Sequence, residues 1–198
     1  MPRAGLSRGA VVDLALAVVD DDGFAGLTLA AVAARAGVAV PSLYKHVAGL
    51  PDLRRAVALR CVEELTGLLE EATAGAHSVP AGSAVDGERV RALARAVRSF
   101  ALARPGRYLA TQGAAWARDP AAVELHAAGE RSIEVIAAAL VPSGRPRQET
   151  VDAVRSVRAL VHGFVMLELD GGFGLPDDVS ASFERAVDVM VAGFAAPV

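Results

Sequence analysis

Cysteine is nearly absent from this chain, with Cys61 the single example among 198 residues. One cysteine excludes an internal disulfide and any zinc site built from several cysteines. We expect Cys61 to be a small buried side chain on an apolar helix face. Four histidines, at 46, 77, 126 and 162, lack the spacing of metalloenzyme motifs. The sequence therefore predicts no metal, no cofactor and no enzymatic activity.

Long hydrophobic runs are lacking too. The most apolar stretch, residues 159–169, is interrupted by His162 and Glu168, and it is shorter than the roughly 20 residues of a membrane-spanning helix. The N-terminal residues lack the long apolar core and small-residue cleavage site of a signal peptide. We therefore predict a cytoplasmic protein with no membrane partner.

Aromatic residues make up only 5% of the chain, although 53% of it is hydrophobic. That fraction is large enough to bury a sizeable core, and it consists mostly of Ala, Val and Leu. Ala and Leu favour helices, whereas the many valines alone favour strands. No stretch alternates apolar and polar residues as a half-buried strand does. The prediction is an all-α fold of about nine helices.

Local signals place these helices along the chain. Ser7 begins a first helix, which ends at the acidic residues 20–22. Thr28 and Gly37 bound a second short helix, a third begins near Pro41, and a long fourth begins at Pro51. Residues 75–87 are rich in Gly, Ser and Pro and predict a connection. The five helices expected after it cover 88–103, 105–117, 120–140, 148–169 and 180–194.

The charge distribution and these helices suggest a division into domains. Residues 1–60 have a net charge of +2, and the remainder has a net charge of −5, which indicates a weakly basic head on an acidic body. We predict a DNA-binding domain over 1–50 with its helix-turn-helix at 28–47. A connecting helix over 51–74 and a ligand-binding and dimerisation domain over 88–198 follow it.

The segment 27–47, LTLAAVAARAGVAVPSLYKHV, carries the functional signal. Two helices of about two turns joined by a tight turn are what a helix-turn-helix requires. Ala33 is small where the two helices must approach each other, and Gly37 can adopt the positive φ of the turn. The second helix of such a pair can enter the major groove of DNA.

GFAGLT, then AARAGVAVPSLYKHV and a long helix, resembles the DNA-binding region of the TetR family of bacterial regulators. ALARPGRY at 101–108 and HGFVMLELDGGFGLPDDVSASFER at 162–185 resemble the family's C-terminal subclass labelled WHG. The resemblance implies a homodimer that binds double-stranded DNA at a palindromic operator. The residues it assigns to DNA contact are Thr28, Val40, Pro41, Ser42, Tyr44, Lys45 and His46.

Two positions depart from the family pattern. Leu50 stands where the family usually has a phosphate-binding lysine, and Ala30 stands where some members have a polar base reader. Because Lys45 is the only lysine, phosphate contacts must depend on arginines such as Arg3, Arg8 or Arg54. About 4–8 phosphates neutralised per dimer are then expected.

In this family the C-terminal domain binds a small effector and dimerises through its last two long helices. Bulky or amphipathic side chains in an Ala/Val background are the candidate pocket residues. They are Phe100, Tyr108, Gln112, Trp116, His126, His162 and Met166. Apolar stripes on the last two helices either form the dimer interface or face the subunit's own core. The interface candidates are Val154, Val161, Phe183, Val187, Met190 and Val191.

The main functional hypothesis is a repressor that a small apolar effector releases from its operator. The effector would shift the long fourth helix and change the separation of the two recognition helices. The alternative is a helical small-molecule-binding protein whose DNA-binding head has degenerated. Leu50 and Ala30 favour this alternative, and the intact SLYKHV favours the regulator.

Overall fold

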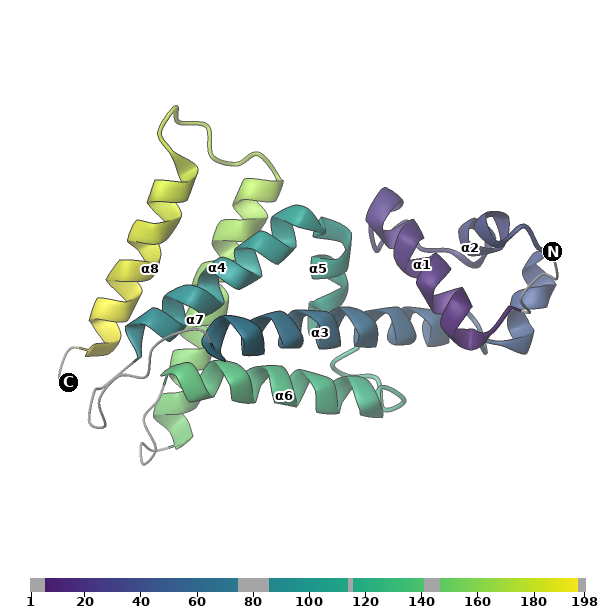
Figure 1. Ribbon diagram of the computed structural model, residues 1–198, viewed down its shortest axis with the longest axis horizontal. Helices are drawn as coiled ribbons and strands as arrows, with labels where there is room; N and C mark the ends of the chain where they lie inside the picture. Colours follow the sequence, from purple (N-terminus) through teal and green to yellow (C-terminus); the bar gives the residue numbers. More distant parts are fainter. Residues whose placement is uncertain (1–5, 75–85, 114–115, 141–146, 196–198) are drawn as a thin grey trace. The chain divides into compact units, whose positions relative to one another are not determined.

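The computed structural model describes residues 6–74, 86–113, 116–140 and 147–195. Throughout these ranges every regular element is a helix and no β-strand occurs, which confirms the predicted all-α fold (Figure 1). The chain forms two compact units. Unit 1 contains Met1–Glu63 and Arg104–Ala128, and unit 2 contains Glu64–Ala103 and Gly129–Val198.

Unit 1 begins with α1 (Arg8–Asp22), α2 (Leu29–Ala36) and the 3₁₀ helix η1 (Val40–Lys45). The hydroxyl of Ser7 accepts a hydrogen bond from the Ala10 amide at 3.1 Å and caps α1. Thr28 caps α2 through the Ala31 amide at the same distance, 3.1 Å. Both predicted N-caps are confirmed.

Two long helices begin in unit 1 and end in unit 2. They are α3 (Leu50–Ala74) and α6 (Val123–Leu140). The short helix α5 (Pro105–Thr111) lies wholly in unit 1.

Two predicted boundaries near α5 and α6 are wrong. The helix expected over 105–117 ends at Thr111, because Gln112 has an extended ψ of 116°. The helix expected from 120 begins at Val123, because Asp119 turns the chain by accepting the Ala121 amide at 2.9 Å.

Unit 2 also contains α4 (Gly87–Ala103), α7 (Arg147–Leu169) and α8 (Val179–Ala195). These three helices pack pairwise against one another. Phe183 of α8 is completely buried, and its ring meets Phe164 of α7 edge to face with 5.1 Å between centroids.

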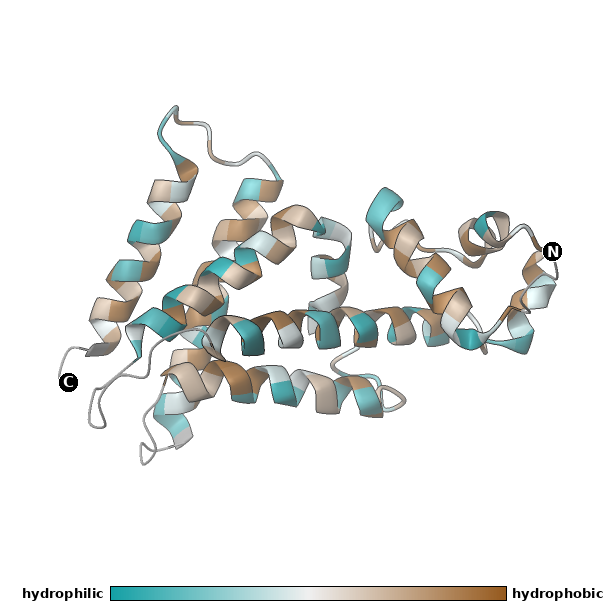
Figure 2. Cartoon of the chain, in the orientation of Figure 1, coloured by the Kyte–Doolittle hydropathy of each residue, from teal (hydrophilic) through white to brown (hydrophobic). Residues whose placement is uncertain are grey.

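The helices α1, α2, η1 and α3 all contribute apolar residues to the core of unit 1. Val11 and Val19 of α1, Leu27 before α2, Leu43 of η1 and Leu53 of α3 are all fully buried. Cys61 of α3 is buried in the same cluster, as predicted. Figure 2 shows that the described helices carry both hydrophobic and hydrophilic residues, as expected for helices with one buried face.

The division of the chain differs from the predicted one, since residues 104–128 join unit 1 and not the C-terminal helices. Gly106 explains the association, because a Cβ atom there would lie 2.2 Å from the carbonyl oxygen of Val19. Only glycine allows α5 to pack this closely on the end of α1. Arg107 of α5 adds two hydrogen bonds to the Asp20 carboxylate, at 2.6 and 2.7 Å.

Candidate nucleic-acid interface

The pair formed by α2 and η1 has the geometry of a helix-turn-helix. Gly37 has a φ of +67°, and the Val38 amide donates to the Ala33 carbonyl at 3.0 Å to close the turn. Leu43 is fully buried against α1 and α3 and holds η1 on the core. The predicted turn at Gly37 is therefore confirmed.

The second element of the pair is a 3₁₀ helix, although a short α-helix was expected. The Ser42 amide donates to the Ala39 carbonyl at 2.9 Å, and the His46 amide donates to the Leu43 carbonyl at 2.8 Å. These bonds span three residues and tighten the turn. Pro41 lies at its start, where the missing amide hydrogen costs nothing.

The seven predicted DNA-contact residues lie on this pair, and none is buried. Tyr44 is the most exposed large apolar side chain of η1, with 57% of its surface accessible. Thr28, Pro41 and Lys45 are exposed, and Val40, Ser42 and His46 are half-buried. A DNA-reading segment needs this accessibility, and the contacts themselves stay predictions.

The structure accounts for Leu50 and for two of the three arginines expected to contact phosphates, Arg8 and Arg54, whereas Arg3 lies outside the described residues. Leu50 is half-buried against the core of unit 1. Arg54 is half-buried and donates to the Leu27 carbonyl at 3.3 Å, beside the N-cap of α2. Arg8 forms two hydrogen bonds with Asp52. No contact among the described residues explains Ala30, which is exposed.

The acids at the end of α1 pair with two other elements of unit 1. Asp20 binds Arg107 of α5, and Asp21 binds Arg35 of α2. Nothing in the spacing of the sequence predicts these two ion pairs. A run of acids at a helix C-terminus, where it opposes the helix dipole, was the available signal.

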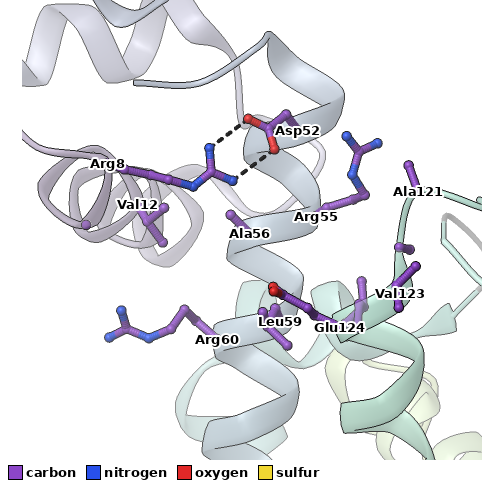
Figure 3. A pocket seen from close by; sticks show the side chains of 13 residues that line it. Arg8, Val12, Asp52, Arg55, Ala56, Leu59, Arg60, Ala121, Val123 and Glu124 are labelled. Atoms are coloured by element: carbon purple, nitrogen blue, oxygen red, sulfur yellow. Dashed lines mark hydrogen bonds and ion pairs between the residues drawn. The ribbon is translucent and has the colours of Figure 1, made fainter. Parts of the chain in front are cut away.

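A groove of about 500 Å³ lies between α1, α3 and the start of α6, all within unit 1 (Figure 3). Arg8, Asp52 and Arg55 line it together with Leu59 and Glu124. Arg55 pairs with Asp119 at 2.9 Å. The Ala121 amide and Arg55 hold the pKa of Asp119 below its usual range. None of the seven predicted ligand-binding residues lines this groove.

Those seven residues divide between the two units. In unit 1, Trp116 and His126 have ring centroids 5.8 Å apart, and the His126 Nε2 atom lies 3.0 Å from the Trp116 carbonyl. Gln112 donates to the carbonyl of the buried Tyr108 at 3.3 Å.

The other three predicted ligand-binding residues, Phe100, His162 and Met166, lie in unit 2. Phe100 is buried, and the other two are half-buried. Burial and the nearby Arg158 lower the pKa of His162. The assignment of all seven to a pocket stays a prediction.

The predicted dimer stripe lies inside unit 2. Five of its six side chains are buried within a single chain, and Met190 is half-buried. The reason is that α4 packs against both α7 and α8 and covers their apolar sides. The contribution of the six residues to a dimer stays a prediction. Among the described residues of α7 and α8, Leu167 and Val189 are the exposed large apolar ones.

No helix among the described residues is both long enough and apolar enough to cross a membrane.

Two family models match the chain. "Bacterial regulatory proteins, tetR family" matches residues 11–46, and "Tetracyclin repressor-like, C-terminal domain" matches residues 90–190. The resemblance to the WHG subclass stays a prediction.

Three known proteins are similar to this chain. The "Uncharacterized HTH-type transcriptional regulator Rv0681" of Mycobacterium tuberculosis is 37% identical over 85% of this chain and 72% of its own length. A protein of unknown function from Rhodococcus sp. RHA1 has a TM-score of 0.78 at 26% identity, over 99% of this chain and 100% of that one.

The third is a single-substitution variant of TetR from Acinetobacter baumannii AYE in complex with minocycline. It shares the fold, with a TM-score of 0.64 at 23% identity over 96% of this chain and 97% of that one. The matched family models, the relative at 37% identity and the helix-turn-helix geometry agree. The chain belongs to the tetR family of bacterial regulatory proteins and is a helix-turn-helix transcriptional regulator.

Proposed function

We propose that this regulator is a repressor that binds a palindromic operator as a homodimer and is released by a small apolar effector. The tetR family consists of regulators that bind DNA and small-molecule effectors and act as dimers. The observation that carries the proposal is the accessible face of η1, where Tyr44 and Lys45 are exposed while Leu43 anchors the opposite side. A reading element needs both properties.

In this proposal η1 enters the major groove, and the N-terminus of α2 with Thr28 contacts a phosphate. Helix N-termini favour anions because their first amides lack partners inside the helix. The half-buried Arg54, beside the same N-cap, supplies positive charge in place of the lysine that Leu50 replaces. Such contacts position the protein on DNA more than they specify sequence.

Two copies are needed because successive major grooves of one operator lie about 34–36 Å apart. We propose that the outer faces of α7 and α8 join the two copies, with Leu167 and Val189 as the apolar contacts. The four helices of the two copies would then pack as a bundle.

We propose that the effector binds in the helical part after α3, and the minocycline complex of the A. baumannii protein supports a small molecule in this fold. In this proposal, effector binding affects DNA binding through α3, because this helix has residues in both units. A small change in its position would shift the population of DNA-competent dimers.

The test is a fluorescence anisotropy titration with palindromic DNA from the neighbouring intergenic region at low salt. We expect Tyr44→Ala/Lys45→Ala to weaken binding at least 100-fold, since the proposed contacts of both side chains with the DNA backbone are lost. The matched control is Leu175→Ala/Arg131→Ala, which removes one exposed apolar residue and one exposed cation from unit 2, both outside α7 and α8. Sedimentation equilibrium should give the same dimer for both variants.

A wild-type protein that binds no operator specifically, with or without candidate ligands, would contradict the proposal. It would favour instead a small-molecule-binding protein with a degenerate head. Equal affinities for the wild type and the Tyr44→Ala/Lys45→Ala variant would show that η1 does not read DNA.

A further inference from the structure

A pair of charged side chains joins the first turns of α1 and α3. The guanidinium of Arg8 donates from Nη1 to Asp52 Oδ2 at 2.8 Å and from Nη2 to Asp52 Oδ1 at 2.9 Å. Figure 3 shows these two parallel bonds. A two-point contact of this kind fixes direction as well as distance, which a single hydrogen bond does not.

The same two side chains also hold the backbone just after η1. Asp52 Oδ2 accepts a hydrogen bond from the Ala48 amide at 2.9 Å. Arg8 Nη1 donates to the carbonyl of His46 at 3.1 Å. Arg8 and Asp52 therefore bind two peptide groups in the segment that leaves the reading element, and we call these four contacts the exit clamp.

The exit of η1 needs such support. A 3₁₀ helix of six residues has weaker backbone bonds than an α-helix, and no side chain caps its N-terminal end at Ala39. Gly49, four residues after the end of η1, has a φ of +149° and permits many backbone conformations. Leu43 anchors the middle of η1 and the buried Val47 anchors the chain after it, and the exit clamp fixes the peptide groups on both sides of Val47.

We propose that Arg8 and Asp52 are positioning residues for DNA recognition, which set the orientation of Tyr44 and Lys45 by holding the exit of η1. The inference rests on the proposed binding of operator DNA through η1. It assigns Arg8 a role other than the phosphate contact that its charge suggests, because its guanidinium already serves Asp52 and His46.

Charge alone makes the opposite prediction for Asp52, and this separates the two explanations. A carboxylate beside a DNA-binding segment repels phosphates, so its removal should strengthen binding if it acts only through its charge. If Asp52 holds the exit of η1, its removal should weaken specific binding in spite of the more favourable net charge.

A second ion pair between the same two helices supplies the control. Arg60 of α3 lies 3.6 Å from Asp13 of α1, and both side chains are more than half exposed, at 52% and 64%. In the exit clamp Arg8 is as exposed as Arg60, at 51%, but Asp52 is only 19% exposed. Asp13→Ala removes the same charge from the same unit as Asp52→Ala, but it touches no backbone group near η1.

The experiment measures operator affinity by anisotropy for the wild type, Asp52→Ala, Asp13→Ala, Arg8→Lys and the exchange Arg8→Asp/Asp52→Arg. We expect Asp52→Ala to weaken specific binding about tenfold, the scale of a lost charge-assisted contact. Arg8→Lys keeps the charge but loses the two-point geometry, so it should weaken binding about threefold. Asp13→Ala should bind as tightly as the wild type or slightly more tightly.

Hydrogen exchange at the Ala48 amide provides a readout that general destabilisation does not reproduce. Asp52→Ala should speed exchange there at temperatures where the α1 and α3 amides stay protected. The exchanged pair keeps an ion pair but reverses donor and acceptor, so it can neither accept the Ala48 amide nor donate to the His46 carbonyl; it should bind no more tightly than Asp52→Ala. If Asp52→Ala binds as well as or better than the wild type, the inference is wrong. If the wild type binds no operator, the proposed function fails first.

Discussion

The two units arrange the contacts that stabilise their helices differently. In unit 1, short elements converge on one apolar cluster, and its members from α1, α2, η1 and α3 are nearly all fully buried. In unit 2, α4 carries arginines one helical turn apart that pair with acids on the neighbouring helices. Unit 1 also has ion pairs between its elements, such as Arg107–Asp20 and Arg8–Asp52, but they are scattered over several helices, whereas those of unit 2 are aligned along α4.

The charge pairs of unit 2 are specific in their register. Arg91 pairs with Asp188 at 2.7 Å, Arg95 pairs with Glu184 at 2.7 Å, and both acids lie on α8. Arg98 reaches Glu168 of α7 at 2.6 Å, and its guanidinium also lies 5.1 Å from the centre of the Phe183 ring. Arg91 and Arg95 are one turn apart, and so are Glu184 and Asp188, so a shift of α8 by one turn would leave only one pair; both pairs form together in a single register.

The largest expected losses of stability come from truncating one buried side chain in the core of either unit. Leu43→Ala in unit 1 and Phe183→Ala in unit 2 each remove a fully buried side chain. Each change should lower the free energy of unfolding by about 3–5 kcal/mol. Hydrogen exchange should speed up around α1, α2 and η1 in the first variant, and around α4, α7 and α8 in the second.

Leu175→Ala is the control for both, since Leu175 is the most exposed large apolar residue described. It should leave stability unchanged to within about 0.5 kcal/mol. If either core variant exposes both units equally, the units do not unfold as separate bodies, and the contrast between them disappears.

The next largest expected effect concerns Gly106, where α5 lies close to α1 within unit 1. Gly106→Ala places a Cβ atom 2.2 Å from the Val19 carbonyl oxygen, a backbone group that side-chain rotation does not relieve. We expect a loss of about 2 kcal/mol, the usual scale of a steric insertion in a packed site. The measurement is urea denaturation followed by circular dichroism.

Gly67→Ala is its control, because Gly67 is also helical and nothing lies within 4 Å of the position a Cβ would take. This change should stabilise the protein by about 0.5–1 kcal/mol, since alanine favours helix more than glycine. A Gly106→Ala variant as stable as Gly67→Ala would mean that α5 does not need its close approach to α1.

The features that the sequence predicts correctly are those that depend on residues close together in the chain. The caps at Ser7 and Thr28 and the turn at Gly37 depend on neighbours within a few residues, so local patterns suffice. The helix-turn-helix and its exposed residues follow from these signals. The end of α5 was missed because Gln112 itself, neither Gly nor Pro, leaves the helix.

Long-range pairing lay beyond the sequence. Asp20 and Arg107 are 87 residues apart, and Arg8 and Asp52 are 44 residues apart, and no spacing rule links such positions. The apolar stripes of α7 and α8 were recognised, but their pattern could not distinguish the subunit's own core from a partner. Within one chain α4 packs against both helices, and Phe183 and Val187 are buried; the role of the stripes in a dimer stays a prediction.

The smallest effect concerns an exposed ion pair between α4 and α8. Arg95 and Glu184 keep 48% and 39% of their side-chain surfaces accessible, so Arg95→Ala should cost only about 0.5 kcal/mol after solvent screening. The hydrogen bond from Arg95 lowers the pKa of Glu184. The pair therefore stabilises the folded state above the usual pKa of a glutamate, and this contribution is lost as the pH falls through the lowered value.

Thermal unfolding of the wild type and Arg95→Ala, from pH 7 downward in 0.05 and 1 M NaCl, should show the largest difference at pH 7 and low salt, and the difference should shrink as the pH falls. Arg98→Ala should keep most of its effect at 1 M NaCl, since Arg98 and Glu168 are shielded. If both variants respond equally to salt, the arginines of α4 act as a diffuse positive face. The apolar seam with Phe183 then sets the register of α8, and the two units differ less than their contacts imply.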